Sequence, residues 1–169
     1  MNKVTFEKLA PWIGLVSRLT LGGVLFLAGF LKYDALDKSQ MAVRAYEILP
    51  ISIANIIGII LPFAEILMGL LLILGAGTRV MGILSALLML VFVIGISQAW
   101  ARGLSIDCGC FGGGGQVEPG TANYLPELIR DAGLAALGIY LFLFPQSKFA
   151  LDKFATTKNL DQKEINDER

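Results

Sequence analysis

The chain has 169 residues and no net charge at neutral pH, and 55% of its residues are hydrophobic against only 17% charged. Soluble domains are roughly a quarter charged and 45–50% apolar, so this composition favours a membrane protein and gives no reason to expect nucleic-acid binding. The absence of histidine excludes the commonest general base and zinc ligand, so we expect no metal site and look to cysteines, other charged groups or a cofactor for chemistry.

Four continuous apolar runs cover about residues 11–31, 51–74, 80–100 and 125–144. A helix needs about 20 residues to cross a hydrocarbon core of about 30 Å, and unbroken rather than alternating runs favour helices over a barrel. The first run lacks a small-residue cleavage site after it, so we interpret it as a retained anchor. The prediction is an all-α membrane protein in the lipid bilayer, with a four-transmembrane-helix bundle over residues 1–146 and a charged cytoplasmic tail over 147–169.

Basic residues predict the orientation of this bundle, because they are enriched in cytoplasmic segments. The side with both termini carries eight of them, which are Lys3, Lys8, Arg79, Lys148, Lys153, Lys158, Lys163 and Arg169. The opposite side carries five, which are Lys32, Lys38, Arg44, Arg102 and Arg130. We therefore expect a multi-pass protein of the cell membrane with both termini in the cytoplasm, and loops at about 32–50 and 101–124 on the outside.

Two charged residues, Arg18 and Glu65, fall inside the predicted spans. Counted at 1.5 Å per residue, they lie about 9 Å and about 15 Å from the cytoplasmic side. Charged groups at such depth are costly and face partners or cavities. The sequence predicts that these two side chains pair, either as a structural ion pair or as part of a proton or quinone site. Glycines in the same spans, such as Gly22, Gly29 and Gly69, predict close contacts between helices.

The only two cysteines, Cys108 and Cys110, lie in the second outer loop with a single glycine between them. A Cys-Gly-Cys bridge closes a minimal ring, so it adds little global stability, and strained or exposed disulfides are the reducible ones. This spacing favours a redox-active pair with Cys108 and Cys110 as the catalytic residues. Arg102 and Arg130 are candidates for lowering a thiol pKa, and Asp107 for raising one. The glycines that follow, residues 112–115, predict a flexible segment.

Three other roles for the cysteines stay open. They are small buried residues near a helix end, a structural bridge that shapes the loop, or a soft-metal site for Cu(I), which thiolates select. Two ligands in one chain without histidine make such a metal site thin, so redox chemistry is the favoured interpretation.

Several stretches together carry a family resemblance. They are Arg18-Leu19 through Gly29-Phe30-Leu31-Lys32, Ala42–Tyr46 with Leu49-Pro50, Leu61–Glu65 with Gly69 and Gly75, Thr78-Arg79, Arg102-Gly103 with Asp107–Gly112, and Arg130-Asp131. In order and spacing they resemble the DoxX-like membrane proteins, and among them the MauE branch named for methylamine utilisation. The resemblance covers about residues 15–145 and implies a four-helix membrane bundle.

The resemblance also implies a role in thiol chemistry. MauE proteins are associated with disulfide formation in the small subunit of methylamine dehydrogenase, and other DoxX relatives with thiosulfate:quinone oxidoreduction. We therefore expect a membrane thiol–disulfide oxidoreductase whose cysteines exchange with an extracytoplasmic thioredoxin-like protein or a disulfide-containing client, with a quinone as electron acceptor. The alternative is a non-catalytic anchor or scaffold subunit of a redox complex.

Overall fold

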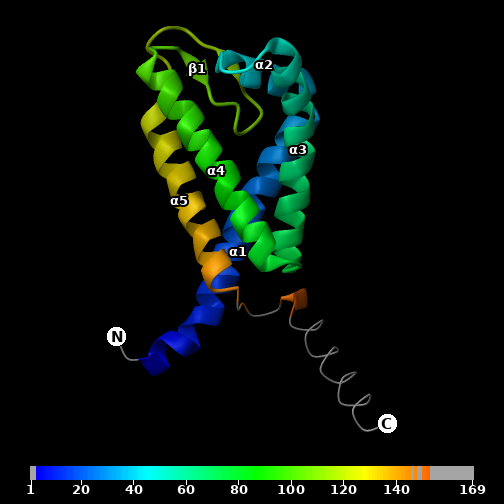
Figure 1. The fold of residues 1–169 in the computed structure, drawn as a ribbon, viewed down its shortest axis with the longest axis vertical. Helices are drawn as coiled ribbons and strands as arrows, with labels where there is room; N and C mark the ends of the chain where they lie inside the picture. The colour runs from blue at the N-terminus through cyan, green and yellow to red at the C-terminus, as the bar shows by residue number, and fades with distance from the viewer. Residues whose placement is uncertain (1–2, 146, 148–149, 153–169) are drawn as a thin grey trace.

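The computed structural model describes residues 3–145, 147 and 150–152, and it is mainly helical (Figure 1). The helices are α1 (Lys3–Tyr33), α2 (Leu36–Ala45), α3 (Ile51–Leu74), α4 (Thr78–Ala101) and α5 (Tyr124–Leu143). Two short strands, β1 (Ile106–Asp107) and β2 (Gly115–Gln116), lie between α4 and α5. The predicted all-α membrane fold is confirmed, and the four predicted runs correspond to α1, α3, α4 and α5.

Three of the described helices are long and apolar enough to cross a membrane, over Leu9–Tyr33, Ile51–Leu74 and Thr78–Ala101. Helix α5 has 20 residues and packs along α4, but its first turns carry Glu127, Arg130 and Asp131. Its crossing of the bilayer therefore remains a prediction. Helix α1 begins earlier than expected, because the chain is helical before Pro11. Figure 1 shows these first turns bent away from the bundle, as a proline inside a helix predicts.

Glycines allow the helices to approach closely in two pairs. A Cβ added at Gly29 would lie 2.5 Å from the carbonyl oxygen of Pro62, and one at Gly22 would lie 2.9 Å from that of Gly69. These contacts join α1 to α3, as the sequence predicts. The same close packing joins α4 to α5, where a Cβ on Gly138 would lie 2.7 Å from the Gly82 carbonyl oxygen. Close backbone approach of this kind is how helices associate in lipid, where apolar burial offers little driving force.

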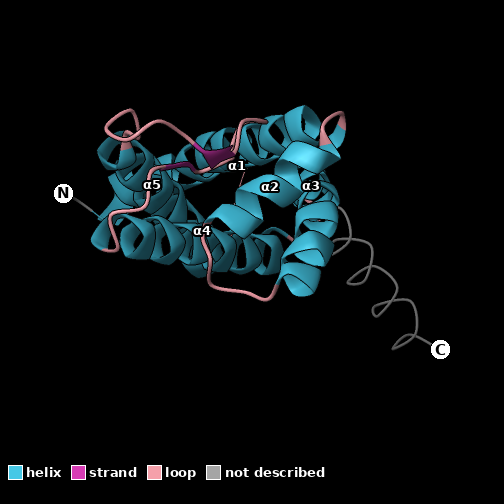
Figure 2. Cartoon of the chain, turned by 90° about the horizontal axis from the view of Figure 1, so that it is seen from above, coloured by secondary structure: helices cyan, strands magenta, loops and turns pink. Residues whose placement is uncertain are grey.

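Helix α2 was expected to be part of an outer loop, and the structure corrects this. It lies across one end of the bundle with the short strands beside it (Figure 2). Its buried face consists of Ser39, Ala42 and Ala45, and the Ser39 hydroxyl donates a 2.7 Å hydrogen bond to the Gly58 carbonyl of α3. The small side chains on this face let α2 lie flat against α3 and the cysteine loop.

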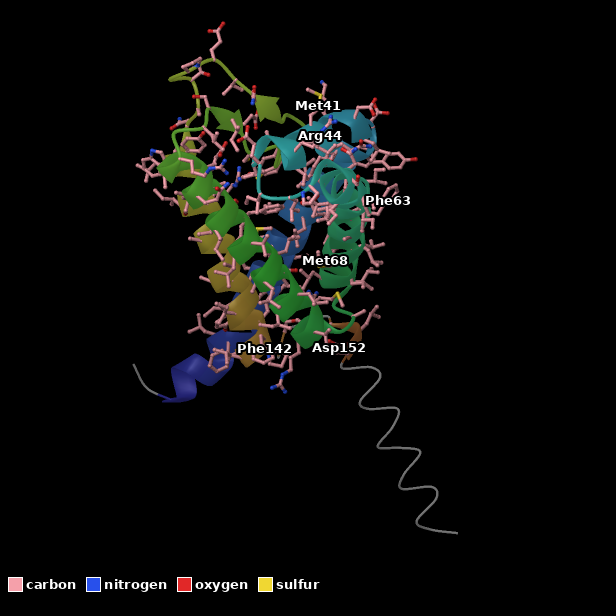
Figure 3. The ribbon with its side chains drawn as sticks, turned by 45° about the horizontal axis from the view of Figure 1, so that its top comes forward. Met41, Arg44, Phe63, Met68, Phe142 and Asp152 are labelled. Atoms are coloured by element: carbon pink, nitrogen blue, oxygen red, sulfur yellow. The ribbon has the colours of Figure 1, made fainter. Side chains whose placement is uncertain are left out.

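The opposite end of the bundle holds the α3–α4 turn and the first described residues of the predicted tail. Figure 3 shows Asp152 there, far from Met41 of α2. The Asp152 carboxylate accepts hydrogen bonds from the backbone N–H groups of Gly77 (2.7 Å) and Thr78 (2.9 Å), so it caps the start of α4. The predicted nature of residues 153–169 lies outside the described residues.

The expected pairing of Arg18 with Glu65 is wrong. Arg18 is buried at the α3–α4 turn, where its Nη1 donates a 2.9 Å hydrogen bond to the Ser147 hydroxyl and where a Cβ on Gly75 would collide with its guanidinium. Glu65 instead pairs with Lys32, whose Nζ lies 2.6 Å from Oε1. The glycine contacts between α1 and α3 fix this register, because they set Arg18 opposite the C-terminal end of α3.

Candidate functional site

The two cysteines occupy the tip of a tight hairpin at the α2 end of the bundle. Strands β1 and β2 pair antiparallel, with Ile106 opposite Gln116 and Asp107 opposite Gly115. The pairing closes the chain on itself directly before Cys108. Both thiols are free and nearly enclosed, with 8% of Cys108 and 6% of Cys110 exposed. The pair is therefore a buried feature of the loop, which bears on every role considered for it.

Two tyrosines fix the backbone of this hairpin. The Tyr46 hydroxyl, at the end of α2, donates a 3.2 Å hydrogen bond to the Cys108 carbonyl. The Tyr124 hydroxyl, at the start of α5, accepts one of 3.1 Å from the Ile106 N–H and donates one to the Leu104 carbonyl. Burial, followed by the neighbouring thiols, raises the pKa of Tyr46, so its hydroxyl stays a proton donor. The cysteine loop is thus tied to two different helices.

The glycines of the loop serve close packing. Gly109 and Gly114 have φ values of +70° and +128°, and a Cβ on either would lie 2.4 Å from the Ala42 Cβ of α2. A Cβ on Gly113 would collide with the Asp107 carboxylate. Gly109 and Gly114 therefore need glycine for conformation and for space, and Gly113 needs it for space. The structure therefore gives residues 112–115 a packing role that the sequence prediction of a flexible segment did not include.

The two thiols have different surroundings, and Cys108 is the one built to be a thiolate. Its Sγ accepts a hydrogen bond from the Cys110 N–H (3.3 Å), and Arg130 Nη2 lies 3.9 Å from it. A hydrogen bond from the Cys110 thiol lowers the pKa of Cys108, and Arg130 lowers it further, although burial opposes both. The same hydrogen bond, and then burial, raise the pKa of Cys110. The pair therefore consists of a low-pKa thiol and a high-pKa thiol.

Arg130 connects the cysteine pair to the carboxylate of Asp131. Its Nε donates a 2.8 Å hydrogen bond to Asp131 Oδ1, and its guanidinium carbon lies 4.9 Å from the centre of the Phe111 ring. Asp131 is 2% exposed. The guanidinium is thus held by a carboxylate and an aromatic ring, which orients its remaining N–H groups toward Cys108.

A small cavity of about 20 Å³ lies between the cysteine loop and the helices. Its polar lining consists of Cys110, Arg130, Asp131 and Glu65. The Lys32–Glu65 pair lies at the same place in the bundle, with both side chains 2% exposed or less. Phe92 of α4 also lines the cavity, and Lys32 Nζ lies 5.8 Å from the centre of its ring. Charged groups from α1, α3 and α5 therefore meet beneath the thiols.

An apolar groove of about 340 Å³ lies on the other side of Phe92. Helices α3 and α4 meet at their shared turn and diverge toward α2 (Figure 1). Residues of α2, α3 and α4 line the space between them, among them Val43, Ile57, Leu61, Val91 and Phe92. Tyr46 carries a hydroxyl in this lining. The groove is large enough for a small organic molecule. It borders Tyr46, whose hydroxyl donates the hydrogen bond to the Cys108 carbonyl.

The predicted site residues divide into two groups. Cys108, Cys110 and Arg130 are brought together, and the Asp107 carboxylate accepts a 2.9 Å hydrogen bond from the Gly109 N–H within the loop. Arg102 is not in contact with either thiol; it is half-exposed and pairs with Glu47 at 3.1 Å.

Sequence reasoning gave no thiol-related role to Tyr46, Lys32, Glu127 or Asp131. For Glu127 and Asp131, the signal was their spacing around Arg130 on one helix.

A metal site is not supported by this geometry. One ligand atom each of Asp107, Cys108 and Glu127 lies within 4.8 Å of the others. However, the Arg130 guanidinium lies against the same sulfur and brings a positive charge where a cation would bind. The two carboxylates and the arginine instead form a mixed-charge surrounding for Cys108.

The fold and this site define a helical membrane protein with a buried Cys-x-Cys pair at one end of its bundle. The sequence profile of the methylamine utilisation protein MauE family matches residues 10–144. The chain belongs to that family, and the match covers all four predicted spans and the cysteine loop. No curated protein sequence and no solved structure matches the chain.

Proposed function

We propose that this protein is a membrane thiol–disulfide oxidoreductase in which Cys108 and Cys110 cycle between dithiol and disulfide. The observation that carries the proposal is the asymmetry of the pair. Cys108 Sγ is contacted by the Cys110 N–H and by Arg130, whereas Cys110 faces the cavity with Asp131 and Glu65. A merely structural bridge has no need for an arginine directed at one of its sulfurs.

The different surroundings of the two thiols support an order for the exchange. In the oxidising direction, a client thiolate attacks Cys108 Sγ, the Cys108–Cys110 bond breaks, and Cys110 leaves with the electron pair and takes up a proton. A second client thiolate then attacks the client sulfur of the mixed disulfide. Cys108 leaves as a thiolate, and the client retains the new disulfide. Thiols of low pKa leave faster, so the contact with Arg130 favours this last step.

The client or partner of the exchange belongs to the same proposal. We place the cysteine loop outside the cytoplasm and both termini inside, as the distribution of basic residues favours. The partner is then an extracytoplasmic thioredoxin-like protein or a disulfide-containing client. A role in methylamine utilisation, which the family name carries, is consistent with such a client.

A quinone is the proposed electron acceptor, and the apolar groove fits its ring and chain. Val43, Leu61, Val91 and Phe92 would surround the apolar parts, and Tyr46 is the group with a hydroxyl at the edge nearest the loop. When bound, a quinone accepts two electrons and two protons, which is the amount that a dithiol releases on forming a disulfide.

A non-catalytic scaffold is the second candidate function, and the burial of both thiols favours it. With only 8% and 6% of the cysteines exposed, a client reaches them only after the loop has moved away from Ala42. In this interpretation the loop serves as a rigid cap on the bundle and the cysteines as packing residues.

Thiol trapping with single-cysteine variants separates the two functions. Cells that produce the protein are quenched with acid, and their thiols are alkylated with a maleimide that changes electrophoretic mobility. Cycling predicts both dithiol and disulfide forms, and a Cys110→Ser variant that accumulates mixed disulfides through Cys108. The matched Cys108→Ser variant should trap far less. A pair found in one state under all growth conditions, with no mixed disulfide in either variant, would refute catalysis.

A further inference from the structure

The cavity beneath Cys110 has the size of a site for one water molecule. Its volume of about 20 Å³ exceeds the roughly 10–15 Å³ that a buried water needs, and such a water requires two to four polar partners. Cys110, Arg130, Asp131 and Glu65 are the polar residues around the cavity, and the rest of its wall is apolar. A water at this position would contact the Cys110 thiol and a carboxylate together.

Two carboxylates line the cavity, and one oxygen of each, Asp131 Oδ2 and Glu65 Oε2, is buried without a hydrogen-bond partner among the described residues. Asp131 is 2% exposed, and its Oδ1 accepts from Arg130 Nε. Its Oδ2 is buried and, among the described residues, has no hydrogen-bond partner. Buried polar atoms are nearly always satisfied, by protein or by ordered water, so this oxygen points to the same water molecule.

Glu65 differs from Asp131 in its counter-charge. Lys32 Nζ lies 2.6 Å from both of its carboxylate oxygens, so the Lys32 ammonium group neutralises the charge of Glu65. Asp131 shares its cation, Arg130, with Cys108. When Asp131 is protonated, its attraction for Arg130 weakens, and the guanidinium can interact more strongly with Cys108. A proton on Glu65 would instead leave the buried Lys32 without a counter-charge.

We propose that Asp131 is the proton acceptor for Cys110, through a water molecule held in this cavity. The inference rests on the proposed redox function and adds a role within it. When Cys108 is joined to a partner sulfur, the Cys110 thiol loses its proton through the water to Asp131 Oδ2. Cys110 Sγ then attacks Cys108 Sγ, the partner thiolate leaves with the electron pair, and the Cys108–Cys110 disulfide is formed. In the reverse direction Asp131 returns the proton.

The other titratable groups near Cys110 fit less well as the acceptor. Asp107 accepts the hydrogen bond of the Gly109 N–H, and Glu127 lies within 4.8 Å of the Cys108 sulfur but is not among the residues that line the cavity. The Tyr46 hydroxyl donates to the Cys108 carbonyl. Glu65 also has a buried oxygen without a hydrogen-bond partner, Oε2, but the Lys32 ammonium lies 2.6 Å from it. Asp131 instead shares its cation, Arg130, with the reacting pair.

Infrared difference spectroscopy of the full-length protein in lipid nanodiscs tests the proposal. The sample is switched between its reduced and oxidised forms with reduced and oxidised glutathione, which supplies the accepting disulfide. We expect loss of the S–H stretch when the wild type is oxidised, together with the C=O stretch of a newly protonated buried carboxyl in the oxidised form. The carboxyl band should vanish in Asp131→Asn, shift in Asp131→Glu and persist in Asp107→Asn.

The kinetics of ring closure give a second readout that does not depend on the band. Asp131→Asn should slow closure from the Cys108 mixed disulfide roughly 100-fold, the lower end for general acid–base catalysis, and should shift its pH profile upward. Asp131→Glu should retain most of the rate. A carboxyl band that survives Asp131→Asn, or that disappears with Glu65→Gln instead, would overturn the assignment of Asp131.

The outcomes also separate this inference from the function on which it rests. Normal loss of the S–H stretch with normal closure in Asp131→Asn refutes the proton acceptor and leaves the oxidoreductase intact. A wild-type S–H stretch that no glutathione mixture changes refutes the oxidoreductase, and the proton acceptor with it.

Discussion

Lys32 of α1 and Glu65 of α3 form an ion pair of 2.6 Å in the interior of the bundle, with exposed fractions of 2% and 1%. The pair lies between the two helices that the glycine contacts bring closest together. It also borders the cavity beneath the cysteines. One interaction thus fixes the register of α1 against α3 and sets the charge below the thiol pair.

Removing one member of this pair should destabilise the protein far more than removing both. Glu65→Gln leaves Lys32 buried without a counter-charge, and we expect a loss of about 3–5 kcal/mol in the free energy of unfolding. The double variant Lys32→Met/Glu65→Leu replaces the pair with apolar groups and should recover most of that loss. Thermal unfolding in detergent, followed by circular dichroism, measures both. Equal destabilisation by the single and double variants would contradict a paired role.

The pH dependence of Cys108 reactivity should reveal the source of its low pKa. A free thiol titrates near about 8.5, and the Cys110 thiol and then Arg130 lower the pKa of Cys108 below its ordinary value. Because the thiolate is the reactive form, alkylation of Cys108 should reach its half-maximal rate at a lower pH than for an ordinary cysteine. Cys110→Ala removes the largest cause and should shift the profile upward.

Arg130→Gln should give a smaller upward shift, since its contribution is the smaller one. Cys110→Ser is the matched control, because its hydroxyl still donates to the Cys108 sulfur, and its profile should stay near that of the wild type. A profile that none of these variants moves would show that the proposed contacts do not set the reactivity of Cys108.

The sequence predicted the long helices well, because the thickness of a bilayer fixes their length and demands continuous apolar runs. It missed α2, whose ten residues are too few to span and whose buried face is made of Ser39, Ala42 and Ala45 rather than large apolar groups. Small side chains give a weak hydrophobic pattern. Their purpose appears only in the structure, where Gly109 and Gly114 pack against Ala42 and Ser39 donates a hydrogen bond to the Gly58 carbonyl.

The sequence identified the main residues of the site but not all of the contacts between them. Cys108, Cys110 and Arg130 were identified from spacing and charge, and the structure brings them together. The partner of Glu65 was missed because depth counts from helix ends do not fix the register of two antiparallel helices. Lys32 lies at the end of α1, where a lysine ordinarily extends to the membrane surface, yet here it turns inward to Glu65.

The packing of the loop on α2 predicts a specific effect at Gly114. Gly114→Ala places a Cβ where φ is +128° and where the Ala42 Cβ is 2.4 Å away, so the loop must move outward. We expect faster alkylation of both cysteines by a small maleimide. Ala42→Gly in the same chain removes the collision but not the backbone strain, and should restore the slow rate in part. Gly23→Ala, with open space around its Cβ, is the control and should leave the rate unchanged.

The orientation of the bundle can be tested without using the buried cysteines. In a Cys108→Ser/Cys110→Ser background, one cysteine is placed at Glu118, which is exposed beside the loop, and in a second variant at Leu151, which is exposed at the opposite end. The excess of basic residues at the Leu151 end predicts that this end is cytoplasmic. A membrane-impermeant maleimide should therefore label Glu118→Cys in intact cells, and Leu151→Cys only after permeabilisation.

The two positions control for each other, because neither substitution removes a basic residue from the balance that sets the topology. The reverse labelling pattern would place the cysteine loop in the cytoplasm. Thiols stay reduced in the cytoplasm, and disulfides persist only in oxidising compartments. That result would therefore argue against disulfide formation by Cys108 and Cys110. The orientation and the proposed direction of exchange therefore stand or fall on one pair of measurements.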